Sequence, residues 1–417
     1  MDIAIAGAGI AGLAAASFLR RFGHRVVIYD QLDKPAPVGS GLIIQPTGQA
    51  VLSALGLGEA LSRRSVRIDR LFGKVARSGR TALDVRFDAR GGKTFGIGVH
   101  RATLFELLFS AAMKSGAEFE PLHEVTGVAA RAGEKAALEF ANGRQSPPYD
   151  LIIDALGLRS PLIERRNAFL DYGALWANIP LTENTALMQN TLEQRYEGAR
   201  KTAGVMPIWS IGSGPPLAAF FWSLRQDHYV RWQADGLDAW KEDVLALWPA
   251  LEAHLETLQN PEQLVFARYA HHTNRAPVED RLVHIGDSWH AASPQLGQGA
   301  NMALLDAYAL AKSIDEMADI SDALAIYKKL RQHHIWLYQT ISQLFTPFYQ
   351  SDSRLLPWLR DSVATPLSQA PPAASILSSM VAGTLGDPLG RLGLSLKPFL
   401  SRDVFSNAAS AQSSVSE

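Results

Sequence analysis

Apolar and polar positions at the start of the chain alternate in the order of a strand, a helix and a second strand. Residues 2–6 and 25–29 are short apolar runs, and residues 13–22 are alanine-rich with helical spacing. A glycine-rich loop at 39–41 follows, and residues 45–55 again have helical spacing. This order is typical of a parallel α/β sheet.

The pattern changes twice further along. Short strands separated by turn residues are predicted between 66 and 98, a helix at 101–112 and a buried strand at 151–153. Residues 171–276 differ in kind, because alternating sheet-like runs precede a helical stretch at 237–258. We therefore expect this region to be an insertion that returns to the first domain at Arg281.

The C-terminal third is predicted to be helical. Ile335, Tyr338, Ile341, Phe345 and Phe348 form an apolar stripe, which indicates helix packing or a homodimer contact more than a membrane-surface helix. Pro371-Pro372 is expected to break the helical region.

Composition excludes several classes of function. The 417 residues are enough for about two domains. Forty basic and forty-one acidic residues give no charge excess for binding nucleic acid. The absence of cysteine excludes disulfides, thiolate metal sites and a cysteinyl link to a flavin. No uncharged run approaches the ~20 residues that span a bilayer, and no signal peptide is recognisable, so we expect a cytoplasmic protein without stable membrane insertion.

The segment Gly7-Ala8-Gly9-Ile10-Ala11-Gly12 follows the first strand and opens the first helix. Gly7 allows a tight turn, Gly9 lets the backbone approach a pyrophosphate, and Gly12 lets helix and strand pack closely. Asp30, at the end of the second strand, is placed to accept hydrogen bonds from a ribose. The predicted dinucleotide contacts of this unit are Gly7, Gly9, Ile10, Ala11, Gly12, Asp30 and Gln31.

A second segment, 286–301, narrows the choice of dinucleotide. Asp287 follows an apolar strand, where its carboxylate can accept a hydrogen bond from a polyol. Gly297 and Gly299 clear side-chain bulk before a helix that starts near Ala300, and free amides at that helix start would stabilise a reduced flavin. The predicted contacts are Asp287, Pro294, Gly297, Gly299, Ala300 and Asn301, and together the two segments indicate FAD.

These residues resemble the single-component FAD-dependent aromatic hydroxylases, the family of para-hydroxybenzoate and salicylate hydroxylases. Their pattern G-D-A-x-H-x-x-x-P-x-x-G-Q-G-x-N is matched by Gly286, Asp287, His290, Pro294, Gly297, Gln298, Gly299 and Asn301, with Ser288 in the alanine place. The resemblance implies that Arg101 lies along the FAD phosphates, that Val125 meets adenine, and that Ser40 and Gly41 border the flavin ring.

One position departs from the family. A Gly-Ala-Asp-Gly run, associated with FAD and the nicotinamide coenzyme, is replaced by Asp154-Ala155-Leu156-Gly157. Gly157 still serves the turn, but Leu156 takes the aspartate place, and the coenzyme contact does not carry over directly.

The resemblance implies an α/β fold: a Rossmann-like FAD-binding domain with an inserted mixed β-sheet substrate domain and a helical C-terminal extension. The expected division gives 1–75, 96–165 and 280–330 to FAD, 76–95 and 166–279 to the substrate domain, 331–405 to C-terminal helices and 406–417 to a disordered tail. Only one G-x-G-x-x-G occurs, so a separate nicotinamide domain is not expected.

The activity implied by the resemblance is NAD(P)H- and O2-dependent hydroxylation of an electron-rich, aromatic or polycyclic small molecule through C4a-hydroperoxyflavin. NADH or NADPH would act as a transient electron donor, and no catalytic base is assigned. Two alternatives stay open: a flavin-dependent reductase or dehydrogenase of the prenyl-reductase type, and a non-catalytic flavin-binding protein.

Two further patterns can be explained without a functional site. The pairs His271-His272 and His333-His334 lack the spacing of a metal site, so no metal is expected. Phe220, Trp222 and Leu224 would share one face of a strand, as sheet core or as the wall of a substrate pocket.

Overall fold

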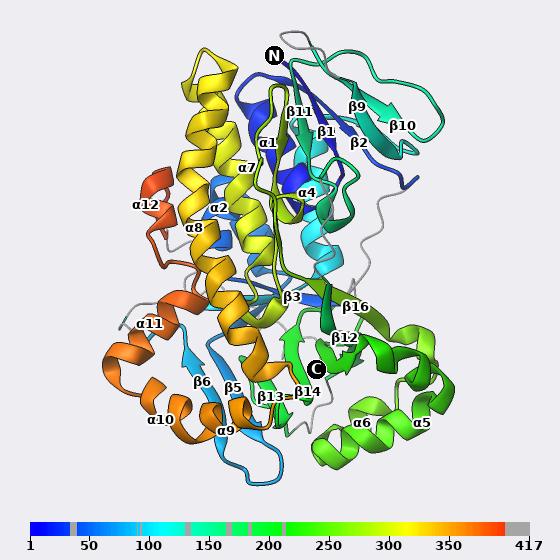
Figure 1. Ribbon diagram of the computed structural model, residues 1–417, viewed down its shortest axis with the longest axis vertical. Helices are drawn as coiled ribbons and strands as arrows, with labels where there is room; N and C mark the ends of the chain where they lie inside the picture. Colours follow the sequence, from blue (N-terminus) through cyan, green and yellow to red (C-terminus); the bar gives the residue numbers. More distant parts are fainter. Residues whose placement is uncertain are drawn as a thin grey trace, which may run out of the picture.

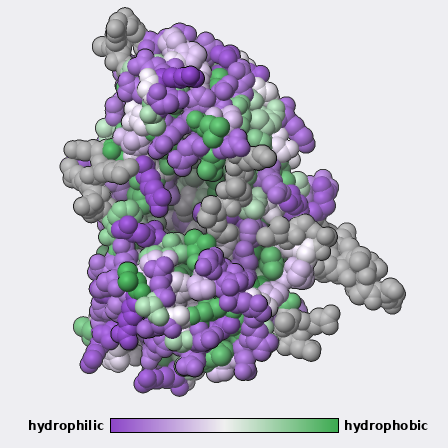
Figure 2. All heavy atoms as spheres, turned by 90° about the vertical axis from the view of Figure 1, so that its right-hand side faces the viewer, coloured by the Kyte–Doolittle hydropathy of each residue, from purple (hydrophilic) through white to green (hydrophobic). Residues whose placement is uncertain are grey.

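The computed structural model describes residues 1–33, 40–89, 91, 94–129, 135–163, 169–181, 186–210 and 214–396. Figure 1 shows two parts, one built on a parallel sheet and the other on a larger mixed sheet, with the long helix α8 (Ile320–Tyr349) running beside both. In Figure 2 the surface between the two parts is hollowed.

The first part contains a five-stranded parallel sheet in the order β18-β11-β1-β2-β8. Its strands are β1 (Asp2–Ala6), β2 (Arg25–Tyr29), β8 (Glu118–Glu120), β11 (Leu151–Asp154) and β18 (Leu282–His284). The helices packed beside it are α1 (Ile10–Arg21), α4 (Arg101–Lys114) and α7 (Gly299–Glu316). Because the strands are parallel, their carboxyl ends meet at one edge, where ligands of such sheets bind.

The second part contains a seven-stranded mixed sheet in the order β16-β12-β15-β14-β13-β5-β6. Its strands are β5 (Arg70–Val75), β6 (Thr81–Arg86), β12 (Phe169–Pro180), β13 (Thr191–Glu197), β14 (Lys201–Ile208), β15 (Leu217–Arg225) and β16 (Val265–Ala270). β5 pairs with β13 and with β6 here, so the sheet begins at Arg70 rather than at the boundary expected at 76. The antiparallel pair β5–β6 therefore extends the sheet beyond β13.

The two faces of this sheet are covered differently. Helices α5 (Tyr229–Leu247) and α6 (Glu252–Leu255) cover the outer face. α5 begins eight residues before the predicted start at 237 and contains a non-helical residue at Gly236. The inner face is covered in part by a three-stranded sheet of β3 (Gly41–Ile44), β7 (Gly96–His100) and β4 (Val66–Ile68).

The remaining elements connect these layers. The predicted helix at 45–55 is α2 (Pro46–Ala54), followed by α3 (Gly58–Ser62). The strands β9 (Val125–Ala129) and β10 (Ala137–Phe140) form a hairpin, and β17 (His272–Thr273) pairs with β19 (His290–Ala291).

After α8 the described chain continues as α9 (Leu355–Leu359), α10 (Thr365–Ser368), α11 (Pro371–Val381) and α12 (Pro388–Leu392). Pro371 begins α11, because the first helical position needs no backbone N–H. The tail predicted at 406–417 lies outside the described residues. None of the described helices combines the length and apolar composition needed to cross a bilayer.

The apolar stripe on α8 is packing. Ile335 and Tyr338 are buried in the main core, and Ile341 and Phe345 pack against it. The α/β fold class is confirmed: a parallel nucleotide-binding type of sheet, a mixed sheet and C-terminal helices.

Candidate functional site

The first glycine turn is shaped by backbone contacts that leave no room for a side chain. Gly7 has a φ of 104°, and a Cβ built there would lie 2.6 Å from the Ala155 carbonyl oxygen. A Cβ on Gly12 would lie 2.1 Å from the carbonyl oxygen of Gly7. The turn is therefore pressed between the start of α1 and the loop after β11.

The start of α1 offers unpaired amides. Gly9 is the N-cap, is exposed and supplies no side-chain cap. The first intrahelical bond runs from the Leu13 amide to the Gly9 carbonyl at 3.0 Å, so the amides of Ile10, Ala11 and Gly12 have no partner within the helix. Such a helix start attracts an anion, and the exposed glycine lets it come close.

Asp30 stands at the end of β2 beside this turn. Its carboxylate accepts from the Ala8 amide at 2.8 Å and from the Leu32 amide at 3.0 Å. Next to it opens a surface pocket of about 350 Å³, which is lined by Gln31, Leu32, Leu122, Glu124, Phe140, Ala141 and Asn142. Of the two predicted residues, Asp30 holds the turn and Gln31 lines the pocket.

The resemblance implies that Val125 meets adenine, together with the adjacent Glu124. Val125 is buried and pairs with Phe140, whereas Glu124 lines the pocket. No motif points to Leu122, which is 65% exposed with a φ of 58° and provides apolar surface at this pocket. Its backbone conformation is rare for leucine and has no local sequence signal.

Asp287 lies between the two helix starts. A Cβ on the preceding Gly286 would lie 3.3 Å from the Ala11 Cβ on α1 and 3.4 Å from the Ala303 Cβ on α7. The Asp287 side chain is exposed, and among the described residues it has no hydrogen-bond partner. A Cβ on Gly157 would lie 3.9 Å from the Asp287 Cβ, so this turn also faces the carboxylate.

The surroundings of Asp287 are those of a recess. Burial among neighbouring atoms raises the pKa of its carboxyl group, although His290 and Arg101 act in the opposite direction. A carboxylate that solvent reaches but that neighbouring atoms surround sits in a concave site. The effect of Arg101 on this pKa also places its guanidinium near the same recess.

The start of α7 repeats the arrangement at α1. Its N-cap Gln298 makes no side-chain cap, and the first helical bond joins the Met302 amide to the Gln298 carbonyl at 2.9 Å. The amides of Gly299, Ala300 and Asn301 are consequently without helical partners. A Cβ on Gly299 would meet nothing within 4 Å, so this approach is open.

The residues before α7 form a tight support. Gly297 has a φ of 62°, and a Cβ there would lie 2.8 Å from the Ile43 side chain. The Asn301 side chain accepts from the Gln45 amide at 2.8 Å and donates to the Gly297 carbonyl at 3.0 Å. Asn301 therefore offers only its backbone amide to a ligand, while Pro294 is exposed at the edge.

Ser40 and Gly41 join the two parts of the molecule. The Ser40 hydroxyl lies 3.0 Å from the Ala177 carbonyl and 2.6 Å from Asn178 Oδ1, both on β12. The Ser40 carbonyl accepts from the Arg101 amide at 3.1 Å, which fixes the start of α4 to this loop. Gly39 lies outside the described residues.

Asp154 does not take the place of the missing family aspartate. It is fully buried and accepts from the Leu156 amide at 2.9 Å, the Ser160 hydroxyl at 2.7 Å and His284 Nδ1 at 2.8 Å. Leu156 itself packs against the apolar cluster that contains Ile152. Neither residue offers a free carboxylate to a coenzyme.

A buried ionic cluster that the sequence did not reveal supports the Asp287 turn. Asp306 on α7 accepts from the Gly286 amide at 2.9 Å, His290 Nε2 at 2.6 Å and Arg331 Nε at 2.7 Å. Burial alone would raise the pKa of Asp306, but His290 and Arg331 outweigh it and hold that pKa below its usual value. His290 of the family pattern thus positions the turn, and no local spacing could pair it with Arg331.

The described residues fit FAD. The uncapped start of α1 fits a pyrophosphate, the open Asp287 carboxylate fits a polyol, and the pocket beside Asp30 fits a base. The uncapped start of α7 fits a ring that gains negative charge on reduction. No group of three or more metal-ligating side chains occurs within the described ranges.

Comparisons with known proteins agree with this geometry. Residues 1–340 match the protein family described as FAD binding domain. Salicylate hydroxylase of Pseudomonas putida is 28% identical over 372 residues, which cover 80% of this chain and 82% of the relative. For 3-amino-4-hydroxybenzoate 2-monooxygenase of Streptomyces cremeus the identity is 25% over 354 residues, with 79% and 82% covered.

Solved structures share the fold. The tetrameric form of 2-methyl-3-hydroxypyridine-5-carboxylic acid oxygenase has a TM-score of 0.75 at 18% identity, covering 93% of this chain and 97% of that chain. A variant of Klebsiella pneumoniae HpxO complexed with FAD has a TM-score of 0.74 at 20% identity, covering 93% and 100%. The matched relatives are hydroxylases and monooxygenases, which favours that prediction over the reductase alternative. The chain belongs to this FAD-binding family and is similar to its FAD-dependent aromatic monooxygenases.

Proposed function

We propose that this protein is an FAD-dependent monooxygenase that uses NAD(P)H and O2 to hydroxylate an electron-rich aromatic or polycyclic small molecule. The observation that carries the proposal is the Asp287 carboxylate, which lies open between the uncapped starts of α1 and α7. The part built on the five-stranded sheet would hold FAD, and the part built on the seven-stranded sheet would hold the substrate.

Each candidate residue then has a place along the cofactor. The amides of Ile10 and Ala11 would bind the pyrophosphate, with Arg101 alongside it. Asp30 would hold the ribose and Asp287 the ribityl chain. The residues that would surround the rings are Gln31 and the neighbours of Val125 at adenine, and Ser40, Gly41, Gly157, Pro294, Gly297, Gly299, Ala300 and Asn301 at the flavin.

When bound and reduced, FAD supplies the chemistry that activates O2 and places one oxygen atom on the ring. The other oxygen atom leaves as water, NAD(P)H provides the two electrons, and a proton is consumed. The free amides of α7 would stabilise negative charge on the reduced ring, a helix-dipole effect of about 0.3–2 kcal/mol. Leu296 and Ile43, both buried, would help to exclude water from that end of the ring.

Hydride delivery is proposed to differ in detail from the family norm. Asp154 is committed to three protein donors and Leu156 is apolar, so neither would contact a nicotinamide coenzyme through a carboxylate. We propose that NADH or NADPH approaches transiently and is held by other groups. Parallel oxidation assays with the two coenzymes would establish the preference.

Location and assembly are also proposals. A cytoplasmic location would supply the NAD(P)H that the reaction consumes, and cell fractionation would test it. A homodimer is proposed on the exposed apolar side chains of α8, Trp336 and Leu344, which are 61% and 64% exposed. Light scattering of the holoprotein would measure the assembly.

The decisive experiment is an NAD(P)H-oxidation screen of the FAD-loaded protein against phenols, quinones and polycyclic aromatics. The expected result is ligand-stimulated oxidation and a product that carries one oxygen atom from isotopically labelled O2. A product that has gained or lost hydrogen without that oxygen would instead support a reductase or dehydrogenase. FAD retention without any coenzyme oxidation would support a binding protein.

A further inference from the structure

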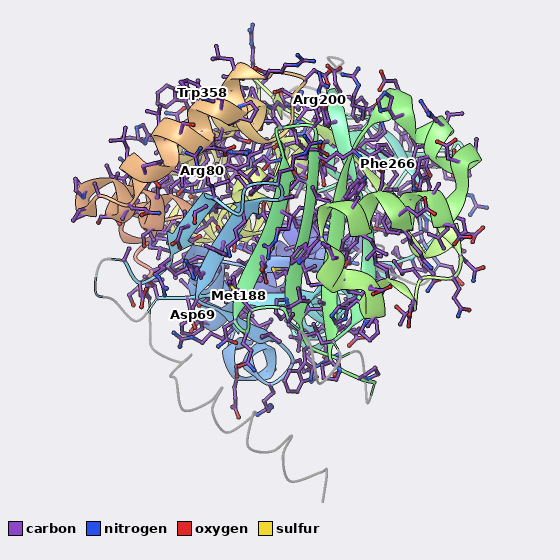
Figure 3. All side chains as sticks on the ribbon, turned by 90° about the horizontal axis from the view of Figure 1, so that it is seen from below. Asp69, Arg80, Met188, Arg200, Phe266 and Trp358 are labelled. Atoms are coloured by element: carbon purple, nitrogen blue, oxygen red, sulfur yellow. The ribbon has the colours of Figure 1, made fainter. Side chains whose placement is uncertain are left out.

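The two faces of the seven-stranded sheet differ in how far their aromatic side chains are buried. On the outer face, Phe220 and Trp222 are buried against α5 and α6, so this face is core rather than pocket. Figure 3 shows Phe266 on the same side as these helices. On the inner face, Trp176 and Phe221 are only partly buried. The alternation along β12 and β15 therefore separates packing aromatics from accessible ones.

The accessible aromatics lie directly beside the part of the inner face that β3 and β7 cover. A Cβ on Gly41 would lie 2.7 Å from Ile208 and 2.8 Å from Ala219, so β3 sits against this part of the sheet. One step along the same face, Trp176 pairs with Phe221, which in turn pairs with Gly204. Phe221 is therefore beside the covered region and not beneath it.

The aromatic side chains form a continuous surface. The rings of Trp176 and Phe221 are 5.0 Å apart, and a Cβ on Gly204 would lie 2.1 Å from the Phe221 ring. Because position 204 is a glycine, the Phe221 ring can lie across β14. Trp176 Nε1 donates to the Tyr269 hydroxyl oxygen at 2.9 Å, and Tyr269 keeps its own O–H to donate. Burial raises the pKa of Tyr269, so the phenol stays protonated.

Two flavin-site loops frame this aromatic surface. On one side, Ser40 lies 2.6 Å from Asn178, the next inner-face residue after Trp176 on β12. On the other side, the Ser293 hydroxyl lies 2.9 Å from Thr346 on α8, and one turn away Ser342 meets His271, two residues beyond Tyr269. The surface consequently lies between the Ser40–Gly41 loop and the loop that leads to α7.

The described side chains in the central rows of this inner face carry no charge. The described inner-face positions around the aromatic residues include Ala174, Trp176, Asn178, Gln194, Thr202, Gly204, Met206, Ala219, Phe221, Ser223, Val265, Ala267 and Tyr269, none of which is charged. Arg225 is two rows beyond Phe221, pairs with Tyr172 and belongs to the row that continues toward Tyr269, but its charge is balanced by Asp227 and Asp352. Burial lowers the pKa of His100 and of His271, so both nearby imidazoles are neutral around pH 7.

We propose that Trp176, Phe221 and Tyr269 bind an uncharged aromatic ring as the substrate, with the Tyr269 hydroxyl hydrogen-bonding its ring hydroxyl group. The Asn178 amide beside them already bonds Ser40 and lies 3.0 Å from His100 Nε2. The proposal rests on the monooxygenase function above and names its substrate class: phenolic rings without a carboxylate. An aromatic wall gains from stacking and apolar burial, whereas a carboxylate placed there would lose its hydration without meeting a cation. The relatives with hydroxybenzoate or salicylate in their names act on carboxylated rings.

The test uses matched ligands on the FAD-loaded protein. Naphthol and hydroxynaphthoate share their ring system and differ in the carboxylate. Dissociation constants from changes in flavin absorbance should favour naphthol at least tenfold, with faster coenzyme oxidation at low ligand concentration. Equal or tighter binding of hydroxynaphthoate would overturn the proposal, and so would failure of both ligands and of other neutral phenols to bind. Tight binding of naphthol without oxygen transfer would instead count against the monooxygenase function alone.

Substitutions on the inner face provide a second readout. Phe221→Leu should weaken naphthol binding about tenfold, whereas the matched control Trp358→Leu, on an exposed position of α9, should leave it unchanged. Asn178→Lys would add a cation and should shift the naphthol-to-hydroxynaphthoate ratio toward the acid by at least tenfold. Normal FAD content would establish that each variant is folded, and an unchanged ratio in folded Asn178→Lys would contradict the placement of the ring.

Discussion

Two neighbouring strands of the parallel sheet, β11 and β18, each have an aspartate at or just after their carboxyl end. One carboxylate is buried and the other is exposed. Asp154 ends β11, is fully buried and accepts hydrogen bonds from three groups of the protein. Asp287 follows β18, is exposed and has no hydrogen-bond partner in the described part of the chain. The strands pair in parallel, so the two side chains belong to the same edge of the sheet.

The difference separates a structural carboxylate from one reserved for a ligand. Asp154 already has the donors that a buried acceptor needs, and it ties β11 to β18 through His284. Asp287 lacks such donors, and its raised pKa shows that the recess disfavours the ionised form until a partner arrives. A polyol hydroxyl would provide that partner.

Removing Asp154 should have the largest effect of all. In Asp154→Ala the donors Ser160 and His284 lose their acceptor inside the core, and we expect the free energy of unfolding to fall by about 3 kcal/mol. Denaturant unfolding of the apoprotein would measure it. Asp154→Asn, which keeps one acceptor oxygen, should lose less. If Asp154→Ala were as stable as the parent but could not bind FAD, the assignment of the two aspartates would be reversed.

Asp287→Ala should instead act on the cofactor. Loss of a charged acceptor for a ribityl hydroxyl should weaken FAD binding about 10- to 100-fold, equivalent to about 1.5–3 kcal/mol. Fluorescence titration of the apoprotein with FAD would measure the dissociation constant. A variant that purifies fully loaded and binds FAD as tightly as the parent protein would remove Asp287 from the site.

Replacing the Asp287 carboxylate by an amide should increase the stability of the apoprotein at neutral pH. The folded state holds the pKa of Asp287 above its unfolded value, so stability falls as the pH rises through that interval. At neutral pH the ionised carboxylate therefore destabilises the apoprotein, and Asp287→Asn should be the more stable protein. The two should unfold alike at a pH below the unfolded pKa, where both side chains are neutral.

The comparison also shows what could be predicted from sequence. The sequence predicts roles for Gly7, Gly12 and Asp287 because each belongs to a short motif with fixed spacing. The cluster around Asp306 could not be predicted from the sequence, because Arg331 and His290 come together only when α8 packs on α7. The sheet alternation identified two faces of β15, but which face α5 covers depends on tertiary packing. The place of β5 in the larger sheet likewise follows from its partner β13, more than a hundred residues away.

Arg101→Ala should produce a smaller loss than Asp287→Ala. The side chain is exposed at the start of α4 and faces solvent as well as the recess, so screening reduces its attraction for a phosphate. We expect FAD affinity to fall about five- to tenfold, or about 1–1.4 kcal/mol. The loss should shrink further at high salt, and an affinity equal to that of the parent protein at low salt would refute the phosphate role.

Leu156→Asp should have the smallest effect on the cofactor. The leucine side chain packs against an apolar cluster and supplies no hydrogen bond, so FAD affinity should stay within about threefold. The substitution restores the family aspartate between Asp154, whose carboxylate already accepts three hydrogen bonds, and the open recess near Asp287. Its informative readout is therefore the rate of FAD reduction by NADH and by NADPH under anaerobic conditions. A changed reduction rate at constant FAD affinity would show that this position acts on the coenzyme alone, whereas a large loss of FAD would mean that Leu156 holds the turn at Gly157 in place.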